Sequence, residues 1–121
     1  MCGILAVIGK EDPALVKGLA RRMNHRGPDE RDMHVDPCGS VLCHERLSIV
    51  DLTTGIQPIK GTKSAYVVHN GEIYNHMELR KTVLSHHQFH TTCDSEVIVH
   101  LYEEFGFDFC NYLDGDFAFV V

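Results

Sequence analysis

The hydrophobic pattern at the start of the chain predicts a strand followed by a helix. Residues 3–8 are continuously apolar, which is typical of a strand covered on both faces. Apolar residues then recur at helical spacing over residues 13–24, and Asp12 followed by Pro13 is a favourable N-cap and first helical position. The helix should end before residues 25–29, where a glycine and a proline both resist helical geometry.

The rest of the chain predicts further strands and two more helices. The strands are expected over residues 31–35, 41–50, 65–69 and 117–121. Asn70-Gly71 has strong turn character and should end the third of these. The helices are expected over residues 75–83, opened by an Asn75–Glu78 capping box, and over residues 94–106, capped by Asp94-Ser95 and stopped by Gly106. This order predicts an α+β layered domain.

Composition narrows the class of protein. A length of 121 residues fits one domain, and 44% hydrophobic with 23% charged residues can form a packed core. The net charge of −6 argues against nucleic acid or an anionic membrane as the main partner. We expect no membrane span and no secretory signal, because the apolar runs are short and no basic leader precedes them. The five cysteines lack a repeating spacing, so we expect reduced thiols in a cytoplasmic protein.

The last five residues, Phe117 to Val121, have the pattern of a buried strand without a polar cap. Natural termini are more often polar and frayed, so we expect the chain to be the N-terminal part of a longer protein. In that case the sheet is incomplete at its C-terminal end. A terminal strand docked into the sheet is the alternative.

The first candidate for chemistry is Cys2. Removal of Met1, which is usual before a small second residue, would place a thiol and a free α-amine on the same residue. A terminal amine titrates near pH ~8 and can accept a proton without a histidine partner. The neighbouring ammonium favours thiolate, and a water between the two groups would relay the proton. Position alone does not establish this role, because most free cysteines are inert small hydrophobes.

Three further segments supply the other groups that hydrolysis of a glutamine side-chain amide needs. Asn70-Gly71 offers an amide donor and an unobstructed backbone N–H for an oxyanion. Arg46 offers a planar fork for the α-carboxylate, and Glu72 and Asp94 are candidates for the α-ammonium. Each also has an ordinary interpretation, as a turn, a solvated strand residue or a helix cap. The hypothesis of glutamine hydrolysis therefore rests on the presence of all these groups together.

Six stretches of the sequence together resemble one family. They are Met-Cys-Gly-Ile at residues 1–4, His25–Asp29, His44–Asp51, Gln57-Pro58, Asn70–His76 and Asp94–Ile98. In this order, over nearly the whole chain, they resemble the glutaminase domain of glutamine-hydrolysing asparagine synthetase, a class II glutamine amidotransferase with an N-terminal nucleophile. The stretches Leu-Ser-Ile-Val-Asp and Gly-Glu-Ile-Tyr-Asn-His favour this branch over the amidotransferases of amino-sugar and purine synthesis.

The resemblance implies a fold and a set of site residues. The fold is a four-layer αββα sandwich of antiparallel sheets, of the N-terminal-nucleophile hydrolase type, of which residues 1–121 would form the N-terminal part, incomplete at the C-terminus. Cys2 would be the nucleophile, and the Asn70 side chain and Gly71 N–H the oxyanion hole. The residues that would bind L-glutamine are Arg46, Leu47, Ser48, Ile49, Val50, Asn70, Gly71, Glu72 and Asp94.

The resemblance also implies what lies outside this sequence. Members of the family continue into an ATP-dependent synthetase domain that makes asparagine from aspartate, and no phosphate-binding loop occurs here. We therefore expect no cofactor for this domain, ATP and magnesium only in the synthetase domain, and at most a glutaminase activity in this chain. A homodimer is possible.

Three rival interpretations remain. Residues 38–44 and 86–90 gather cysteines and histidines, but they lack the paired, repeated spacing of zinc ligands, and we expect no metal. Cys43 and His44 are adjacent on a predicted strand, so they should point to opposite faces and cannot form a catalytic pair. The third alternative is a catalytically inert fragment that serves only as a folded or interaction module.

Overall fold

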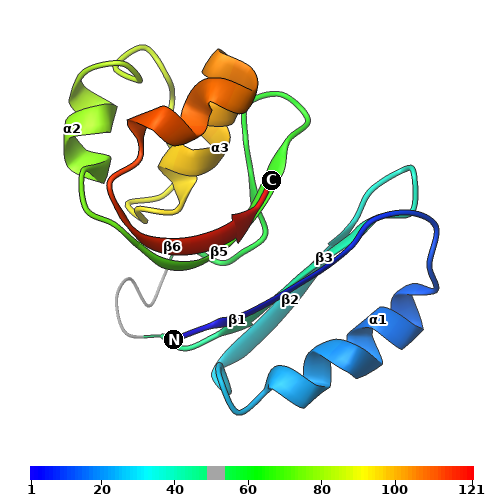
Figure 1. Cartoon of the computed structure of the whole chain (residues 1–121). Coiled ribbons are helices and arrows are strands. Elements are labelled where there is room, and N and C mark those ends of the chain that lie inside the picture. The colour runs from blue at the N-terminus through cyan, green and yellow to red at the C-terminus, as the bar shows by residue number, and fades with distance from the viewer. Residues whose placement is uncertain (49–53) are drawn as a thin grey trace.

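The computed structural model describes residues 1–48 and 54–121 as two antiparallel sheets with helices packed on them (Figure 1). Sheet 1 has the strand order β1-β3-β2 and consists of β1 (Gly3–Val7), β2 (Glu30–Val35) and β3 (Val41–Arg46). Sheet 2 has the order β4-β5-β6 and consists of β4 (Ile59–Lys60), β5 (Tyr66–Ile73) and β6 (Gly115–Val120). The helices are α1 (Pro13–Ala20), α2 (His76–Lys81) and α3 (Glu96–Phe105), with 3₁₀ turns at η1 (Arg21–Met23) and η2 (Gly106–Tyr112).

Sheet 1 and α1 form the first half of the molecule. The helix begins as predicted, because the Asp12 carboxylate accepts a hydrogen bond from the Ala14 N–H at 2.9 Å and Pro13 takes the first helical position. The turn η1 extends the helical segment to Met23, close to the predicted end. The core between α1 and sheet 1 is small and consists of Val16, Ala20, Val41 and Cys43.

Sheet 2, α2 and α3 form the second half. Its core is larger, because α3 buries a broad apolar face against β5 and α2 adds a further side chain. The buried residues are Ile59, Val67, Ile73, Leu79, Leu84, Val97, Ile98, Val99, Leu101 and Phe109. The helix α3 ends at Gly106, as predicted, where the backbone adopts a φ of 59°.

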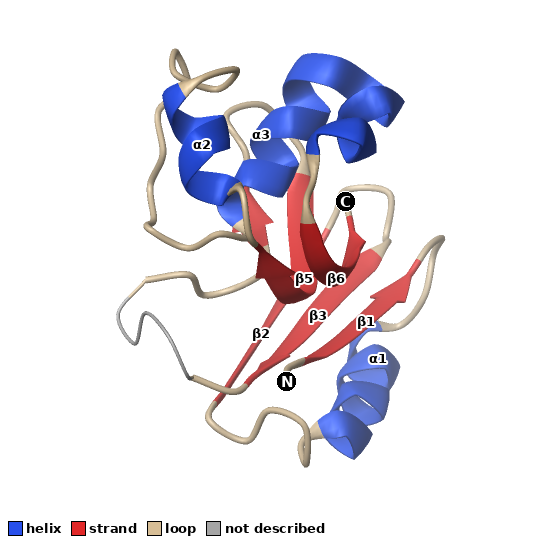
Figure 2. Ribbon diagram, turned by 60° about the vertical axis from the view of Figure 1, so that its left-hand side comes forward, coloured by secondary structure: helices blue, strands red, loops and turns tan. Residues whose placement is uncertain are grey.

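The two sheets face each other through the side chains that alternate with these core positions. Tyr66 of β5 stacks on His34 of β2, with ring centroids 3.5 Å apart, and this contact joins the two inner faces. The helix α1 covers the outer face of sheet 1, and α2 and α3 cover the outer face of sheet 2 (Figure 2). The predicted α+β class and the αββα order of layers are therefore confirmed.

The predicted strand boundaries are wrong in two places. Asn70-Gly71 does not form a turn but lies inside β5, which continues to Ile73 because it pairs with β6 as far as Gly115. The strand predicted over residues 41–50 ends earlier, at Arg46, and residues 47 and 48 are outside any strand.

The predicted capping box before α2 is also wrong in mechanism. Asn75 does precede the helix, but its side chain makes no capping hydrogen bond. Instead, Asn75 Nδ2 donates to the Tyr112 carbonyl at 2.8 Å, and Asn75 Oδ1 accepts from the Asp114 N–H at 3.1 Å. Asn75 thus joins the start of α2 to the segment that leads into β6. The helix ends at Lys81, two residues before the predicted end.

Among the described residues, every helix falls short of the length and apolar character that a membrane-spanning helix requires.

Candidate active site

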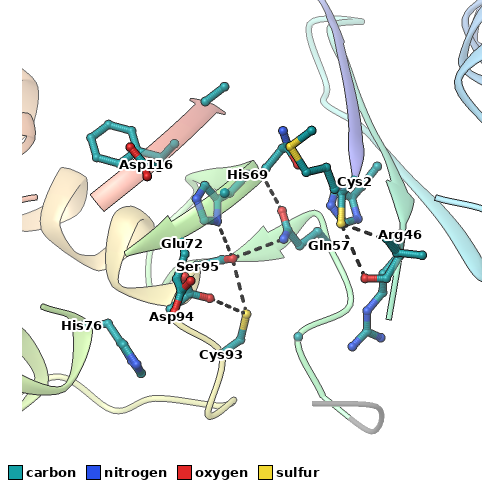
Figure 3. A pocket seen from close by; sticks show the side chains of 18 of the residues that line it. Cys2, Arg46, Gln57, His69, Glu72, His76, Cys93, Asp94, Ser95 and Asp116 are labelled. Carbon is teal, nitrogen blue, oxygen red and sulfur yellow. Dashed lines mark hydrogen bonds between the residues drawn. The ribbon is translucent and has the colours of Figure 1, made fainter. Parts of the chain in front are cut away.

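A pocket of about 730 Å³ lies where the two sheets face each other, beside the N-terminus (Figure 3). Sheet 1 contributes the residues around the start of β1 and the end of β3, and sheet 2 contributes the end of β5, part of β6 and the segment before α3. Most of the predicted site residues line this pocket: Cys2, Arg46, Leu47, Asn70, Gly71, Glu72 and Asp94. Ser48 is not among the lining residues, and the predicted residues Ile49 and Val50 lie outside the described part of the chain.

Cys2 is half-buried at the edge of sheet 1, and hydrogen bonds with Leu47 and Arg26 fix its position. Its Sγ accepts a hydrogen bond from the Leu47 N–H at 3.4 Å and lies 3.9 Å from the Leu47 carbonyl, to which the thiol donates. Its backbone carbonyl accepts a hydrogen bond from Arg26 Nε at 3.1 Å. The Arg26 contact places this loop beside the nucleophile candidate.

The loop of residues 25–29 also holds the end of β3. Gly27 packs so closely against the Glu45 carbonyl that a Cβ at this position would collide with it. The Asp29 N–H donates to the Arg46 carbonyl at 3.1 Å, and the Asp29 carboxylate accepts from the Ser48 N–H at 2.7 Å. One short loop therefore positions both Cys2 and the backbone of residues 46–48. Ser48 supports the pocket through its backbone.

Arg46 is buried at the end of β3, and contacts with Glu30 and Thr54 help to orient its guanidinium. Nη1 forms an ion pair with Glu30 of the neighbouring strand at 2.9 Å, and Nη2 donates to the Thr54 carbonyl at 2.9 Å. Arg46 also lines the pocket, so its charged guanidinium is held in a fixed orientation at the pocket wall. A carboxylate ligand would therefore meet an arginine whose plane is already set by Glu30.

Asn70 and Gly71 lie on the opposite wall, on β5. Gly71 has a φ of 141°, and a Cβ there would collide with the carbonyl oxygen of Asp116 on β6. Only glycine fits this close approach of two strands without displacement. The Asn70 side chain lines the pocket one residue earlier. The pairing of β5 with β6 thus places a side-chain amide and a glycine N–H next to each other at the pocket.

Glu72 and Asp94 give this wall its negative charge. Glu72 is exposed at the pocket mouth, near the end of β5. Asp94 does not cap α3 through its side chain as predicted; its Oδ2 accepts a hydrogen bond from the Ile73 N–H at 2.7 Å. This contact ties the segment before α3 to the end of β5. Figure 3 shows Glu72 and Asp94 across the pocket from Cys2 and Arg46.

Sequence reasoning missed a buried hydrogen-bond network behind this wall. Ser95 Oγ lies 2.7 Å from His69 Nδ1 and accepts from Gln57 Nε2 at 3.3 Å, while Gln57 Oε1 accepts from the His69 N–H (Figure 3). All three residues line the pocket and join three separate segments. Gln57 and Ser95 lie in stretches that carry the family resemblance, so a signal existed for them. His69 had no signal, because it resembles any other strand residue.

Burial favours the neutral form of His44 and His69, two of the histidines that line the pocket. Burial lowers the pKa of His44 to about 4, and burial likewise lowers the pKa of His69, although the Asp94 carboxylate opposes that shift. These two imidazoles therefore add little charge to the pocket. Positive charge on the sheet 1 wall comes from Arg46, and negative charge on the sheet 2 wall comes from Glu72, Asp94 and Asp116.

The remaining cysteines are poorer nucleophile candidates than Cys2. Burial raises the pKa of Cys93, whose thiol contacts Asp94 Oδ1 at 3.5 Å and Ser95 Oγ at 3.4 Å. Burial also raises the pKa of Cys43, which lies in the core under α1, whereas His44 lines the pocket. The prediction that Cys43 and His44 point to opposite faces is confirmed. All five cysteines are unpaired in the structure.

The arrangement suits a zwitterionic ligand. A pocket with a guanidinium on one wall and carboxylates on the other can orient the carboxylate and ammonium groups of an α-amino acid. A thiol and a side-chain amide then face the space where the ligand's own side chain would lie. Among the described residues, the group of histidine and acidic side chains compact enough for a metal ion lies outside this pocket.

Comparison with known proteins defines the class first. Residues 1–121 match the family model described as a glutamine amidotransferase domain, and the chain therefore belongs to that family. Individual relatives show which members of this family the chain is similar to. The chain is 52% identical over 128 residues to asparagine synthetase [glutamine-hydrolyzing] 2 of Oryza sativa subsp. japonica and 50% identical over 127 residues to the nodule asparagine synthetase [glutamine-hydrolyzing] of Pisum sativum. It is 48% identical over 127 residues to asparagine synthetase [glutamine-hydrolyzing] 1 of Arabidopsis thaliana.

Each of these comparisons covers 100% of this chain but 21% of the relative. The chain thus spans about a fifth of the length of the curated relatives that it matches. The resemblance seen in the six sequence stretches is confirmed at the level of the family.

Proposed function

We propose that this chain hydrolyses the side-chain amide of L-glutamine, with Cys2 as the nucleophile once Met1 has been removed. One observation carries the proposal: Cys2 and Arg46 lie on one wall of a single pocket, and Asn70, Gly71 and the acidic pair lie on the other. The opposite charges orient the two ends of the amino acid, so its side-chain amide meets the sulfur. Membership of the glutamine amidotransferase family supports this substrate class.

In the first step, Cys2 Sγ attacks the amide carbon of glutamine, and a C–S bond forms. The negative charge that develops on the carbonyl oxygen is stabilised by the Asn70 side chain and the Gly71 N–H. The α-amine of Cys2 receives the thiol proton through a water and donates a proton to the leaving nitrogen. The C–N bond then breaks and releases ammonia, which leaves a thioester on Cys2.

In the second step, a water attacks the thioester carbon while the α-amine accepts its proton. The tetrahedral oxyanion binds the same two donors, the C–S bond breaks, and the sulfur recovers a proton. The products are glutamate and ammonia, and one water is consumed for each glutamine. The water-mediated proton transfer requires a free α-amine on Cys2, so Met1 must be absent.

In the longer protein, the ammonia would serve an ATP-dependent synthetase domain that converts aspartate to asparagine. The names of the relatives support this assignment, and ATP and magnesium would act in that domain, outside this sequence. A cytoplasmic location is supported by five unpaired cysteines, which suit a reducing compartment. A homodimer stays a prediction.

The proposal is tested with protein whose loss of Met1 has been verified by intact mass. Glutamine should yield glutamate and ammonia in equal amounts, and Cys2→Ala should lower the rate by on the order of 10⁴-fold or more. Cys38→Ala changes an exposed cysteine outside the pocket and should leave the rate unchanged. Asn70→Ala should lower kcat by about 10²–10³-fold with little loss of stability, because it removes one oxyanion donor.

A glutamine analogue that carries a thiol-reactive electrophile gives an independent test. It should form a single adduct on Cys2, mapped by peptide mass spectrometry. Labelling of Cys43 or Cys93 instead, or full turnover by protein that retains Met1, would overturn the mechanism. A folded sample without Met1 that releases no ammonia would support the inert module.

A further inference from the structure

A second cluster of chemistry-bearing side chains lies away from the pocket, between α2 and α3. His86 and His87 belong to the turn that follows α2, and Glu104 lies near the end of α3. His87 Nε2 is 3.1 Å from Glu104 Oε2, and His86 Nε2 is 3.5 Å from the same oxygen. Figure 1 shows α2 and the segment after it beside α3. None of the three residues lines the active-site pocket.

A buried hydrogen-bond chain leads to this cluster from inside the protein. Glu96 is fully buried, and its Oε1 lies 3.3 Å from His100 Nε2. The burial of Glu96 alone would raise its pKa, but hydrogen bonds from His100, His90 and Thr91 lower that pKa to about 2. Glu96 is therefore a carboxylate, which only accepts hydrogen bonds. His100 must donate to it from Nε2.

The tautomers of the next two rings follow from this contact. When a neutral His100 donates from Nε2, its Nδ1 carries a lone pair and accepts. His100 Nδ1 lies 3.0 Å from His87 Nδ1, so His87 donates from Nδ1, and a neutral His87 then keeps its lone pair on Nε2. That lone pair faces the Glu104 carboxylate. Two acceptors at 3.1 Å repel each other unless a proton or a metal ion lies between them.

The donor set and its spacing fit a transition metal ion. Two imidazole nitrogens with one carboxylate form a common zinc ligand set that leaves one position for water. Ligand atoms 2.0–2.1 Å from a tetrahedral zinc ion lie roughly 3.3–3.4 Å apart, close to the two distances to Glu104. The three ligand atoms already lie within 4.8 Å of one another. A carboxylate–imidazole chain behind one ligand is the outer-shell arrangement that orients metal-binding histidines.

We propose that His86 Nε2, His87 Nε2 and a Glu104 carboxylate oxygen bind one zinc ion, with water as the fourth ligand. His86 is 61% exposed and can move the short distance that the third bond requires, whereas His87, at 9% exposure, is fixed by His100. The ion joins the turn after α2 to α3, so it stabilises the outer layer of sheet 2. This differs from the absence of metal expected from the sequence, where Glu104 lies 17 residues from His87.

The test uses the whole chain, without an affinity tag and stripped of metal with a chelator, titrated with zinc chloride in a calorimeter. One zinc per chain should bind, and the midpoint of thermal unfolding should rise with zinc concentration. His87→Ala and Glu104→Gln should each weaken binding by more than about 100-fold, since changes to outer-shell partners alone cost about 10–100-fold. Glu104→Gln changes an exposed side chain and keeps its shape, so circular dichroism should show an unaltered fold.

His90→Ala is the matched control. His90 lies in the same histidine-rich stretch, but it contacts Glu96 through its backbone N–H, which the substitution keeps. Zinc affinity should therefore be unchanged. Binding that survives both His87→Ala and Glu104→Gln would overturn the proposal, as would a cobalt(II) derivative whose spectrum shows thiolate ligands. Failure to bind zinc, with a proton shared between His87 and Glu104 in the NMR spectrum, would also overturn it. These outcomes do not depend on glutamine hydrolysis.

Discussion

The two halves of the molecule position their site residues in different ways. The sheet 2 half places Asn70, Gly71 and Asp94 on elements that pack against a large apolar core and a buried polar network. The sheet 1 half has a small core, and Cys2 lies before its first strand. Cys2 is fixed instead by hydrogen bonds from Leu47 and from the loop of residues 25–29.

Packing therefore positions the site residues of the sheet 2 half, whereas hydrogen bonding positions the nucleophile candidate of the sheet 1 half. The oxyanion donors and the acidic wall depend on the tight interior of one half, where displacement of an element is costly. The nucleophile depends on a few polar contacts at the edge of the other half, where displacement costs less. Stability and nucleophile position should therefore respond to different mutations.

The largest expected effect comes from a matched pair of core substitutions. Val97→Ala on α3 and Val16→Ala on α1 remove the same two methyl groups from fully buried sites. We expect the free energy of unfolding to fall by about 3 kcal/mol for Val97→Ala and by about 1.5 kcal/mol for Val16→Ala, because a small core with half-buried neighbours collapses around a cavity more easily. Urea denaturation measures both values. Equal losses would show that the two cores are equally tight.

Acid should destabilise the halves in two separate pH windows. His44 in sheet 1 has a pKa of about 4, below its ordinary 6.5, so the unfolded chain takes up a proton first. The stability that neutral His44 contributes is complete above pH 6.5 and is lost as the pH falls toward 4. Glu96 in α3 has a pKa of about 2, below its ordinary 4.5, so its contribution is complete above pH 4.5 and is lost toward pH 2.

The loss of unfolding free energy in each pH window should be about 2 kcal/mol after allowance for solvent screening. The free energy of unfolding, measured against pH in metal-free buffer, should show both. His44→Gln should reduce the loss in the upper window, to which His69 also contributes, and should leave the lower window. Glu96→Gln should remove the loss in the lower window and leave the upper one. A parent protein with constant stability between pH 6.5 and 4 would contradict the His44 assignment.

The smallest expected effect is on the loop that holds the nucleophile. Arg26→Gln removes the long side chain whose Nε donates to the Cys2 carbonyl, and we expect kcat for glutamine hydrolysis to fall about 10-fold, or about 1.4 kcal/mol, with little change in KM. Alkylation of Cys2 should slow in parallel, and Arg26→Lys should restore part of the rate. Arg22→Gln, an exposed substitution nearby, is the control. An unchanged kcat would show that Leu47 alone positions Cys2.

Sequence reasoning succeeded where the determining contacts are local. Asp12 and Pro13 start α1 as expected because the cap and the helix are adjacent in the chain. It failed where contacts with a distant segment override the local sequence preference. Asn70-Gly71 is drawn into a strand by β6, and Asn75 binds the segment before β6 instead of capping α2.

The same distinction applies to the sites. The residues proposed to bind glutamine lie in stretches that carry a family resemblance, so their presence in one pocket could be predicted. The network of Gln57, His69 and Ser95 depends on three segments that meet in space, and no spacing rule connects them. The cluster of His86, His87 and Glu104 depends likewise on how α3 packs beside the turn after α2.

The close approach of Gly71 to Asp116 has a consequence for how sheet 2 assembles. Strands can shift past each other by a residue during folding, and such a shift exchanges the faces of every side chain. A one-residue shift of β5 would place a residue adjacent to Asn70 in the chain at the pocket, in place of Asn70. A shift of β6 along β5 would bring a residue other than Gly71 opposite the same tight backbone contact, where a side chain does not fit. The absence of a side chain at Gly71 thus fixes the register of β5 and β6. Single-residue insertions in β5 or β6 should therefore be tolerated far less well than insertions in the loops of sheet 1.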